Sequence, residues 1–393
     1  LGNVYNGNYG YRILGKAGGD KLGTDVKNAG DVNGDGYPDI IISAPYTSAP
    51  SRASSGKVYV LYTNPTPMGG YQDIDLLTDS FSGFTILGAA ASDYIGMSIA
   101  GVDINGDGYS DVMVGASNKV VAGRTSAGAV YVVFGRPGIM GTVDLAAFPA
   151  SRSTGFMIYG GTNYRLGQGL NFAGDVNRDG IADLLIRCPG VKKTFVLYGQ
   201  PYGMGASDLD FTAFQSGVMG FEISGGEYDG VVTAVLDVNG DQIDDILLSS
   251  VEDNALGRIG VGLSYVIYGR AIYQSSRAPT TVPTAQPSTR TPTVHPTTNP
   301  TASPSLPPTV SPTRLPTYTP TAVPSNAGNR LDRTVTAAVE VGGGIKLTGT
   351  TLSMGVGNAV ASLGDFDGDG KVDFAVTASV ASPLGLTQAG IVY

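Results

Sequence analysis

One nine-residue pattern recurs five times in the sequence and constrains the fold more than any other feature. Written Asp-x-Asn/Asp-x-Asp-x-x-x-Asp, it occupies residues 31–39, 103–111, 175–183, 237–245 and 365–373. Each copy has oxygen-bearing side chains at positions 1, 3, 5 and 9, and a main-chain carbonyl is available at position 7. A hard cation such as Ca²⁺ takes six to eight oxygen ligands. Grouped carboxylates repel one another unless a cation lies among them. The alternative is a set of Asx-rich turns that bind nothing, and the recurrence of the pattern in five copies favours calcium loops over it.

The predicted calcium ligands are the four side chains and the position-7 carbonyl of each loop, which allows up to five Ca²⁺ ions. In chain order they are Asp31, Asn33, Asp35, Tyr37, Asp39; Asp103, Asn105, Asp107, Tyr109, Asp111; Asp175, Asn177, Asp179, Ile181, Asp183; Asp237, Asn239, Asp241, Ile243, Asp245; and Asp365, Asp367, Asp369, Lys371, Asp373.

The loops belong to a longer repeat that predicts an all-β fold. Each loop ends in Asp and runs into an apolar segment, such as residues 39–45, so it is not a helix–loop–helix site closed by a bidentate Glu. An aromatic or apolar segment ending in Gly precedes each loop, and a β-branched and aromatic segment follows. These outer segments are residues 11–15, 84–88, 156–160, 221–225 and 345–349 before the loops, and 57–62, 129–134, 194–198, 264–268 and 391–393 after them. Such repeats predict sheets packed around an axis, a β-propeller with five blades visible.

A Pro/Thr/Ser-rich segment interrupts the repeats between the fourth and fifth loops. From Pro279 to Pro324 the sequence holds no Asp or Glu. This composition favours extended polyproline II, which would span roughly 140 Å if straight. It is typical of O-glycosylated stalks, and the alternative is a bare disordered linker. The glycosylation candidates are Thr280, Thr284, Thr293, Thr297, Thr301, Thr309, Thr313, Thr317 and Thr321.

The interruption divides the chain into three parts. Residues 1–270 hold repeats 1–4, residues 271–326 form the extended linker, and residues 327–393 hold repeat 5. The last part either completes the propeller or pairs with a neighbouring chain. The sequences at 2–5 and 390–393 match the same strand of the repeat. Ring closure by pairing of the chain ends, a window on a longer propeller, and strand exchange with a neighbour all remain open.

The pattern resembles the FG-GAP repeats of the integrin α-subunit N-terminal propeller. The residues that carry the resemblance are the Phe-x-Ile-x-Gly segment, a Leu-Gly or Ile-Gly turn, the acidic loop, and the Ser-Ala-Pro at 43–45 or Gly-Ala-Ser at 115–117. The resemblance covers the chain outside residues 271–330. It implies about seven blades, with calcium in the loops stabilising the fold rather than catalysing a reaction.

Two loops depart from the shared pattern. Gln242 stands at position 6, where the other loops have glycine, and a non-glycine residue is strained there if φ is positive. The loop at 237–245 is therefore expected to bind calcium most weakly. Arg178 replaces the position-4 glycine of the third loop, which matters less because its side chain can point to solvent.

Composition and residue placement argue against several function classes. The chain has one histidine, His295, and it lies in the Pro/Thr/Ser-rich segment, so no Ser-His-Asp or Cys-His site can assemble in the fold. Lys and Arg form no basic stripe, and no apolar run is long enough to span a membrane, so nucleic acid and membrane spans are not expected. Calcium loops of modest affinity fill outside the cell, which favours an extracellular or cell-surface location.

Three functions remain. The first is a non-enzymatic, calcium-braced structural subunit of a fibre, hair or wall, whose partners are other chains, including copies of itself, and glycans on the Pro/Thr/Ser-rich segment. The second is an adhesion or ligand-binding module like the integrin α propeller. The third and most remote is a polysaccharide-active enzyme. The absence of a catalytic histidine in the repeats favours the first two.

Overall fold

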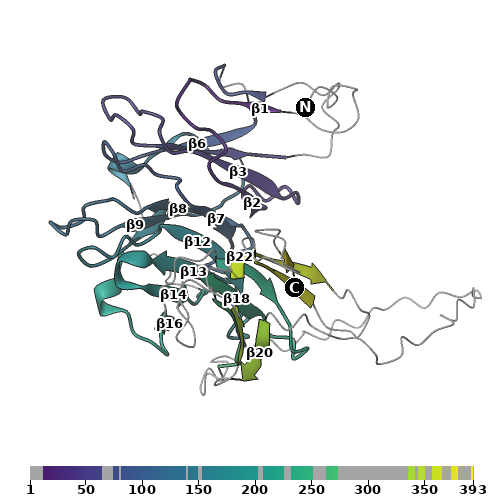
Figure 1. Cartoon of the computed structure of the whole chain (residues 1–393). Coiled ribbons are helices and arrows are strands. Elements are labelled where there is room, and N and C mark those ends of the chain that lie inside the picture. The colour runs from purple at the N-terminus through teal and green to yellow at the C-terminus, as the bar shows by residue number, and fades with distance from the viewer. Residues whose placement is uncertain are drawn as a thin grey trace, which may run out of the picture. The chain divides into compact units, whose positions relative to one another are not determined.

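The computed structural model describes most of the first four repeats and parts of the fifth. The described residues are 12–63, 74–78, 81–138, 140–148, 153–201, 207–224, 232–250, 263–272, 335–340, 344–349, 356–364, 373–378 and 391–392. They form β-strands and three short 3₁₀ helices, η1 (Leu145–Ala147), η2 (Pro189–Val191) and η3 (Phe211–Ala213) (Figure 1). Within this part of the chain, no helix is long and apolar enough to cross a membrane.

Successive sheets share one plan of four antiparallel strands. The first strand lies before the acidic loop in the sequence and the second lies directly after it. The third strand comes next in the sheet, and the Phe-x-Ile strand is the fourth, outer strand. In the first sheet these are β2 (Val26–Gly30), β3 (Asp39–Ala44), β4 (Lys57–Leu61) and β6 (Gly83–Leu87); in the second, β7 (Ile99–Val102), β8 (Asp111–Ala116), β9 (Ala129–Val133) and β11 (Gly155–Tyr159); in the third, β12 (Gly169–Gly174), β13 (Asp183–Cys188), β14 (Lys193–Leu197) and β16 (Gly220–Ser224).

The fourth sheet continues across the Pro/Thr/Ser-rich segment. It contains β17 (Val232–Leu236), β18 (Asp245–Ser250) and β19 (Leu263–Ile267), and its fourth strand is β21 (Gly344–Gly349), with β20 (Val335–Glu340) beyond it. β19 and β21 pair antiparallel within this chain, for example Val266 with Ile345. The last sheet is described in part, as β22 (Val356–Gly364), β23 (Asp373–Ala378) and β24 (Ile391–Val392).

The sheets are offset from the sequence repeat by one strand. The Phe-x-Ile strand precedes its acidic loop in the sequence, yet it pairs with the third strand of the preceding sheet, as β6 pairs with β4. Each repeat therefore completes the sheet of the repeat before it, and in the first three sheets one two-residue strand lies in the chain between the third strand and this outer strand.

Two-residue strands, here called straps, connect neighbouring sheets. β5 (Ile74–Asp75), β10 (Val143–Asp144) and β15 (Leu209–Asp210) each follow the third strand of one sheet and pair in parallel with the outer strand of the sheet before it. β10 thus joins β6, β15 joins β11, and β5 joins β1 (Ile13–Leu14). Each strap covers a sheet edge that would otherwise expose unpaired N–H and C=O groups.

The first strand of each sheet was not predicted from the sequence, which indicated only a Gly-containing turn there. Its residues are small, as in Val-Lys-Asn-Ala-Gly for β2 and Ile-Ala-Gly-Val for β7. These strands contact one another in the order β2, β7, β12, β17 and β22. A Cβ at Gly101 would lie 2.4 Å from Cα of Ala29, so the small residues allow the two backbones to approach closely.

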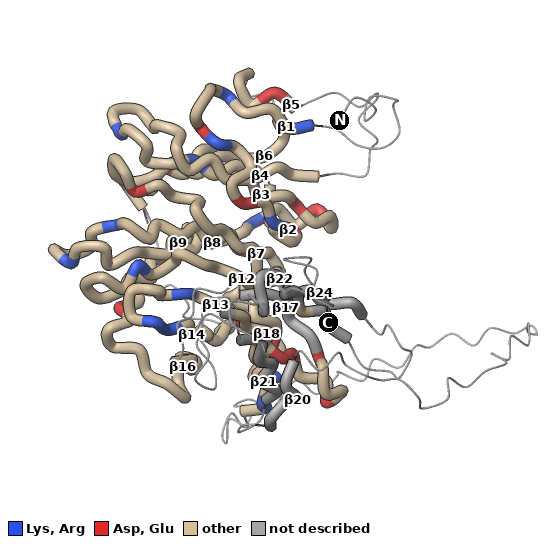
Figure 2. Tube along the Cα trace, in the orientation of Figure 1, with Lys and Arg blue, Asp and Glu red and all other residues tan. Residues whose placement is uncertain are grey.

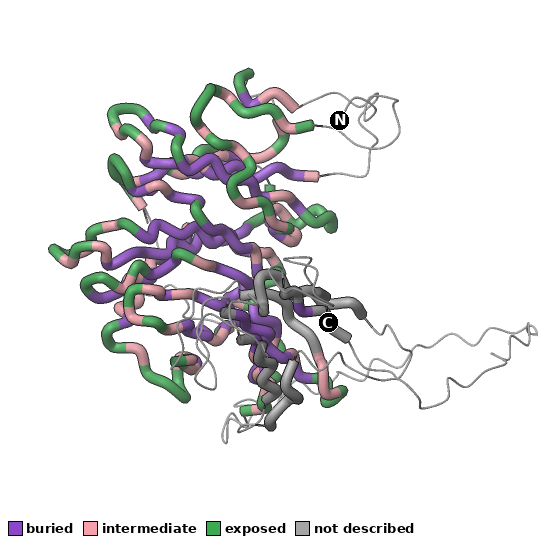
Figure 3. The backbone as a smooth tube through the Cα atoms, in the orientation of Figure 1, coloured by how far each residue is buried: buried purple, intermediate pink, exposed green. Residues whose placement is uncertain are grey.

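The hydrophobic core lies between successive sheets. Val58 and Ile86 of the first sheet cluster with Val114 and Tyr131 of the second, and all four are at most 1% exposed. Similar clusters join the second sheet to the third and the third to the fourth. Buried positions run along the strands and exposed ones gather at the hairpin tips (Figure 3). A sheet with both faces apolar requires such neighbours, which is why the repeats assemble rather than fold alone.

The chain divides into two units, each with its own internal contacts. The first contains Leu1–Ile272 and Leu331–Tyr393, and the second is Tyr273–Arg330. The second unit lies outside the described residues, as do the predicted polyproline II conformation and all nine glycosylation candidates.

Candidate functional site

Each acidic loop closes the hairpin between the first and second strands of a sheet. Position 9 begins the second strand and pairs with the residue just before position 1, as Asp39 pairs with Gly30. The same register recurs at Asp111, Asp183, Asp245 and Asp373. In the fifth loop, residues 365–372, including the predicted ligands Asp365, Asp367, Asp369 and Lys371, lie outside the described residues.

The carboxylate at position 1 organises the turn of its own loop. In the first loop, Asp31 Oδ1 accepts hydrogen bonds from the N–H groups of Gly34 (2.7 Å) and Asp35 (3.1 Å). Its Oδ2 accepts from the N–H of Gly36 at 2.7 Å. The Asn33 side chain accepts from the Asp35 N–H at 2.9 Å and donates to Asp35 Oδ2 at 3.0 Å. The loop is therefore held by the same oxygens that the sequence predicted as ligands.

This arrangement recurs in the other three described loops. The carboxylates of Asp103, Asp175 and Asp237 accept from the N–H groups at positions 5 and 6, and the position-5 carboxylate accepts from position 7. The amide-to-carboxylate bond between positions 3 and 5 is also present in each. The shared geometry follows from the shared spacing, since short Asp and Asn side chains reach backbone groups two to five residues ahead.

The aspartate at position 9 is buried and connects two parts of its sheet. Asp39 is 1% exposed, and its carboxylate accepts from the N–H of Val32 in the loop and of Thr63 after β4, both at 3.0 Å. Asp111, Asp183 and Asp245 make the equivalent pairs with Ile104 and Gly135, Val176 and Gly199, and Val238 and Gly269. The sequence predicted position 9 as a ligand but gave no sign of these partners.

Burial shifts the titration of these aspartates. Desolvation raises the pKa of Asp39 and of Asp245 to about 6, against opposing backbone hydrogen bonds, and neighbouring loop carboxylates raise both further. The same causes raise the pKa of Asp183 to about 8 and that of Asp111 well above its usual value. A cation held by the loop would favour the charged form of all four residues.

Positions 4 and 6 both have positive φ. At position 6, Gly36, Gly108 and Gly180 have φ of 88°, 90° and 90°, and Gln242 has φ of 66°. The conformation behind the predicted strain at Gln242 is therefore present. At position 4, Arg178 has φ of 58° where Gly34 has 77°, so Arg178 shares a backbone conformation that favours glycine. The sequence prediction for Arg178 rested on where its side chain could point and not on its backbone conformation.

Neighbouring loops contact one another. The Tyr109 ring at position 7 of the second loop lies over Gly34 of the first, since a Cβ on Gly34 would lie 2.3 Å from the ring. Ile181 lies over Gly106 in the same way, 3.0 Å from such a Cβ. The N–H of Ser110 donates to the Asp31 carbonyl at 2.8 Å, and that of Arg136 to the Val32 carbonyl at 3.0 Å. The first loop is thus held by the sheet that follows it, and the N–H groups of Gln200 and Arg270 donate in the same way to the Ile104 and Val176 carbonyls of the second and third loops.

The donor set of the loops fits a hard cation. Every predicted ligand is a carboxylate, amide or carbonyl oxygen, and no Cys or His intervenes. Within the described residues, however, no three Asp, Glu, His or Cys side chains gather around a point where they could hold a metal ion. The carboxylates are directed at backbone N–H groups of their own loops, as described above.

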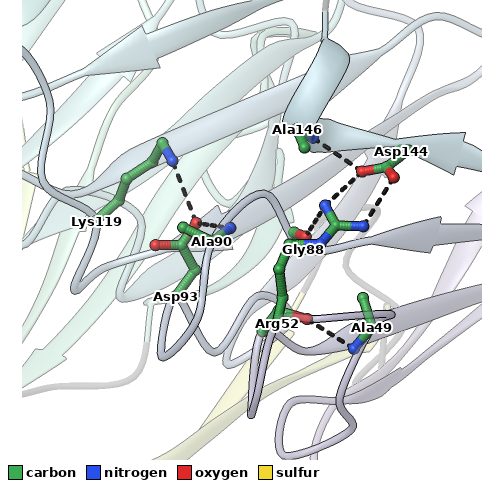
Figure 4. Close-up of polar contacts among 9 residues, drawn as sticks. Ala49, Arg52, Gly88, Ala90, Asp93, Lys119, Asp144 and Ala146 are labelled. Carbon is green, nitrogen blue, oxygen red and sulfur yellow. Dashed lines mark hydrogen bonds and ion pairs between the residues drawn. The ribbon is translucent and has the colours of Figure 1, made fainter.

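Ion pairs reinforce two of the straps. Arg52, in the hairpin between β3 and β4, binds both carboxylate oxygens of Asp144 in strap β10, at 2.6 and 2.7 Å, and donates to the Gly88 carbonyl at 2.8 Å (Figure 4). Arg124 binds Asp210 of strap β15 in the same way, at 2.9 Å for each oxygen. An arginine recurs at the same place after the acidic loop in these adjacent repeats, and this recurrence is the sequence signal that could have found the pairs.

Elsewhere the charges are dispersed along the described chain, with no basic stripe (Figure 2). A cavity of about 450 Å³ lies beside β6, between the β3–β4 hairpin and the segment before strap β10. Phe81, Thr85 and Thr142 line it, and Lys57 is its one charged lining residue. It therefore offers no pair of carboxylates for glycoside chemistry.

Comparisons with known proteins agree with the fold. A profile of the FG-GAP repeat matches residues 28–61, 95–133 and 356–393. The phosphatidylinositol-glycan-specific phospholipase D of Bos taurus is 34% identical over 169 residues, which is 43% of this chain and 19% of the phospholipase. Integrin alpha-7 of Mus musculus is 29% identical over 165 residues, 41% of this chain and 12% of the integrin. Integrin alpha-3 of Mus musculus is 29% identical over 170 residues, 43% of this chain and 14% of the integrin.

These matches bear on the repeats rather than on whole proteins, because the chain spans less than a fifth of the length of each of these relatives. The matched FG-GAP segments each contain an acidic loop and the strands on both sides of it. The FG-GAP repeat is itself a non-enzymatic module. The chain therefore carries FG-GAP repeats, and its fold is an integrin-like FG-GAP β-propeller.

Proposed function

We propose that the acidic loops bind Ca²⁺ and that the ions brace neighbouring blades of an extracellular propeller. The residues that would hold an ion in the first loop are Asp31, Asn33, Asp35, Asp39 and the carbonyl of Tyr37, and the equivalent positions serve in the other loops. The ion would neutralise carboxylates that otherwise repel one another. The observation that supports this role is the set of hydrogen bonds that the following sheet donates to the loop, as at the Asp31 and Val32 carbonyls of the first loop.

Bracing follows from where these contacts lie. Asp31 and Asn33 carry predicted ligand side chains, and their main-chain carbonyls accept hydrogen bonds from the N–H groups of Ser110 and Gly138 in the part of the chain that follows. An ion that fixes the loop therefore also fixes the acceptors at the junction between two sheets. A ligand that binds the folded state alone stabilises it, and the stabilisation grows with the logarithm of the ligand concentration once that concentration exceeds the Kd.

The metal proposal is tested with the double variant Asp35→Ala, Asp107→Ala. Full-length protein is stripped with EDTA, and its melting temperature is recorded before and after Ca²⁺ is added. We expect Ca²⁺ to raise the melting temperature of the unsubstituted chain and to raise that of the variant by clearly less. An equal rise in both proteins would contradict the ligand assignment.

For the biological role we propose a structural subunit of a cell-surface or matrix assembly. The propeller would be braced by calcium, and the segment that interrupts it has the composition of an O-glycosylated stalk. This combination is what a structural subunit of a fibre, hair or wall would need. The extracellular or cell-surface location of the integrin α and phospholipase D relatives supports the compartment. Its partners would be other chains, including copies of itself.

The similarity to integrin alpha-7 and alpha-3 favours a second candidate with equal weight, an adhesion module that binds a protein ligand. Electron microscopy of natively isolated protein, with and without EDTA, separates the two. Polymers that come apart without calcium would support the structural subunit. Single particles under both conditions would contradict it and favour the adhesion module.

A further inference from the structure

A chain of hydrogen bonds, here called the relay, joins the four described acidic loops to one another. It begins at position 2 of the first loop, where the N–H of Val32 donates to the carboxylate of Asp39 at 3.0 Å. The carbonyl of Val32 accepts from the N–H of Arg136, which follows the third strand of the next sheet, at 3.0 Å. Position 2 therefore links a predicted ligand of the first loop to the backbone of the second sheet.

The second sheet continues the relay to its own loop. Gly135 directly precedes Arg136, and its N–H donates to the carboxylate of Asp111 at 2.9 Å. Asp111 is position 9 of the second loop and is fully buried. Two consecutive N–H groups of the chain are thus bonded to two different loops, one to a carbonyl of the first and one to a predicted ligand of the second.

The contact at Gly135 is tight. A Cβ on Gly135 would lie 2.3 Å from the carbonyl oxygen of Ser110 in the second loop and 2.9 Å from that of Val32 in the first. The backbone between the two loops therefore has little room to move independently of either. A displacement of one loop is passed to the other rather than absorbed, because close-packed groups transmit strain.

The same two steps recur at the next two junctions between sheets. The position-2 residue donates to the position-9 carboxylate, and its carbonyl accepts from the residue after a glycine whose own N–H binds the next position-9 carboxylate. At the second junction the bonds are Ile104 to Asp111 (3.1 Å), Gln200 to Ile104 (3.0 Å) and Gly199 to Asp183 (2.9 Å); at the third they are Val176 to Asp183 (3.0 Å), Arg270 to Val176 (2.8 Å) and Gly269 to Asp245 (2.8 Å). The relay ends in the fourth loop, where Val238 donates to Asp245 at 2.9 Å.

Side-chain and main-chain bonds reinforce the first and third junctions. At the first, the N–H of Ser110 in the second loop donates to the carbonyl of Asp31 in the first at 2.8 Å. At the third, the carboxylate of Asp244 in the fourth loop accepts from the N–H of Asp175 in the third at 2.9 Å. Asp31 and Asp175 both occupy position 1, so the first predicted ligand residue of each of these loops is held by the loop that follows.

We infer that Ca²⁺ binding to neighbouring loops is cooperative and that the relay is the coupling element. The inference rests on the proposed function, because it concerns the same loops as calcium sites. Position 9 is both a predicted ligand and the acceptor of two relay hydrogen bonds. A loop whose position-9 carboxylate is fixed also holds the backbone on which the next loop depends, so the next loop loses less freedom when it binds in turn.

Coupling through the relay has a signature that other causes lack. The first and second loops are separated by one junction, whereas the first and fourth are separated by three. An effect carried by the relay is largest between adjacent loops and falls with each junction. A change in the charge of the protein or in its overall stability would reach distant loops as well as adjacent ones.

Hydrogen exchange of the full-length chain reads the loops separately. Peptides covering residues 31–39, 103–111 and 175–183 are followed by mass spectrometry over a series of free Ca²⁺ concentrations, and each midpoint of protection gives the concentration at which that loop fills. The variants are Asp107→Asn and Asp241→Asn, at position 5 of the second and fourth loops. Each removes one carboxylate but keeps a side-chain oxygen for the position-7 N–H, which donates to Asp107 and Asp241 at 2.9 Å. For the first loop, the second variant is therefore the matched control.

We expect Asp107→Asn to raise the calcium midpoint of the first loop by about fivefold or more, and Asp241→Asn to raise it by less than about twofold. The third loop, which also adjoins the second, should respond to Asp107→Asn as the first loop does. An unchanged midpoint of the first loop in Asp107→Asn would overturn the inference. Equal shifts of that midpoint in both variants would overturn it too, because distance would then play no part.

The result separates the coupling from the calcium assignment itself. If Ca²⁺ protects the loops of the unsubstituted chain but Asp107→Asn leaves the first loop unchanged, the assignment stands and the coupling is refuted. If Ca²⁺ protects no loop of the unsubstituted chain, both are refuted.

A variant of the first loop covers the case in which Asp107→Asn misfolds. Coupling between two binding sites acts equally in both directions. Asp35→Asn should therefore raise the calcium midpoint of the second loop by about the same factor that relates the second loop to the first. An unchanged midpoint of the second loop in Asp35→Asn would refute the coupling.

Discussion

Exchanging the residues at position 6 of two acidic loops measures the strain at Gln242. Gln242 has φ of 66° in a position where Gly36 has φ of 88°, and a Cβ built on Gly36 would have no heavy atom within 4 Å. The exchange therefore changes backbone strain without adding a steric clash. We expect Gln242→Gly to stabilise the fold and Gly36→Gln to destabilise it.

The magnitude follows from two opposing terms. A non-glycine residue in the left-handed region costs about 1–2 kcal/mol. Glycine loses more conformational freedom on folding, which offsets about 0.4–1 kcal/mol of that gain. The net change is about 0.5–1 kcal/mol in each direction, and because the two loops are distant the changes in a double variant should nearly cancel.

Urea unfolding in EDTA gives the free energies without any contribution from metal. Repeating the titration with Ca²⁺ shows whether the loop at 237–245 gains affinity once position 6 is glycine. An unchanged unfolding midpoint for Gln242→Gly together with a lowered midpoint for Gly36→Gln would show that the two positions do not share one cause of strain.

Two further predictions concern contacts between sheets. Tyr109→Ala removes the ring over Gly34, so we expect it to lower the calcium affinity of the first loop several-fold, as measured by calorimetry. The matched variant Tyr37→Ala, at a side chain that is 40% exposed, should change this affinity little. Equal effects of the two variants would contradict a role for the contact. Hydrogen bonds from Arg124 lower the pKa of Asp210 to about 2, so this aspartate contributes stability above its unfolded pKa of 3.8 that is lost as the pH falls toward 2. Because the pair is partly exposed, the contribution is small. Arg124→Met should reduce the fall in the urea midpoint between pH 6 and pH 2.5, and an unchanged pH dependence would exclude the pair as the source of that fall.

The local features of the fold were readable from the sequence. The acidic loops, the apolar strands that follow them and the β-branched third strands are set by spacing and alternation within a few residues, and the structure confirms the all-β repeats. The positive φ at Gln242 was also anticipated, because glycine at the equivalent position of the other loops indicates a backbone conformation that other residues avoid.

Tertiary structure decided what depends on partners far away in the sequence. The first strand of each sheet was not predicted because its residues are small. Gly101 and Ala29 allow two backbones to approach closely, and such small residues give no strong strand pattern in either segment. The assignment of each Phe-x-Ile strand to the preceding sheet follows from pairing across a long connection. Likewise, the sequence shows Asp39 only as an acidic residue, whereas its partners Val32 and Thr63 are set by the register of three strands. Spacing along the chain determines which groups can reach their near neighbours, and only the packing of sheets determines which distant groups they meet.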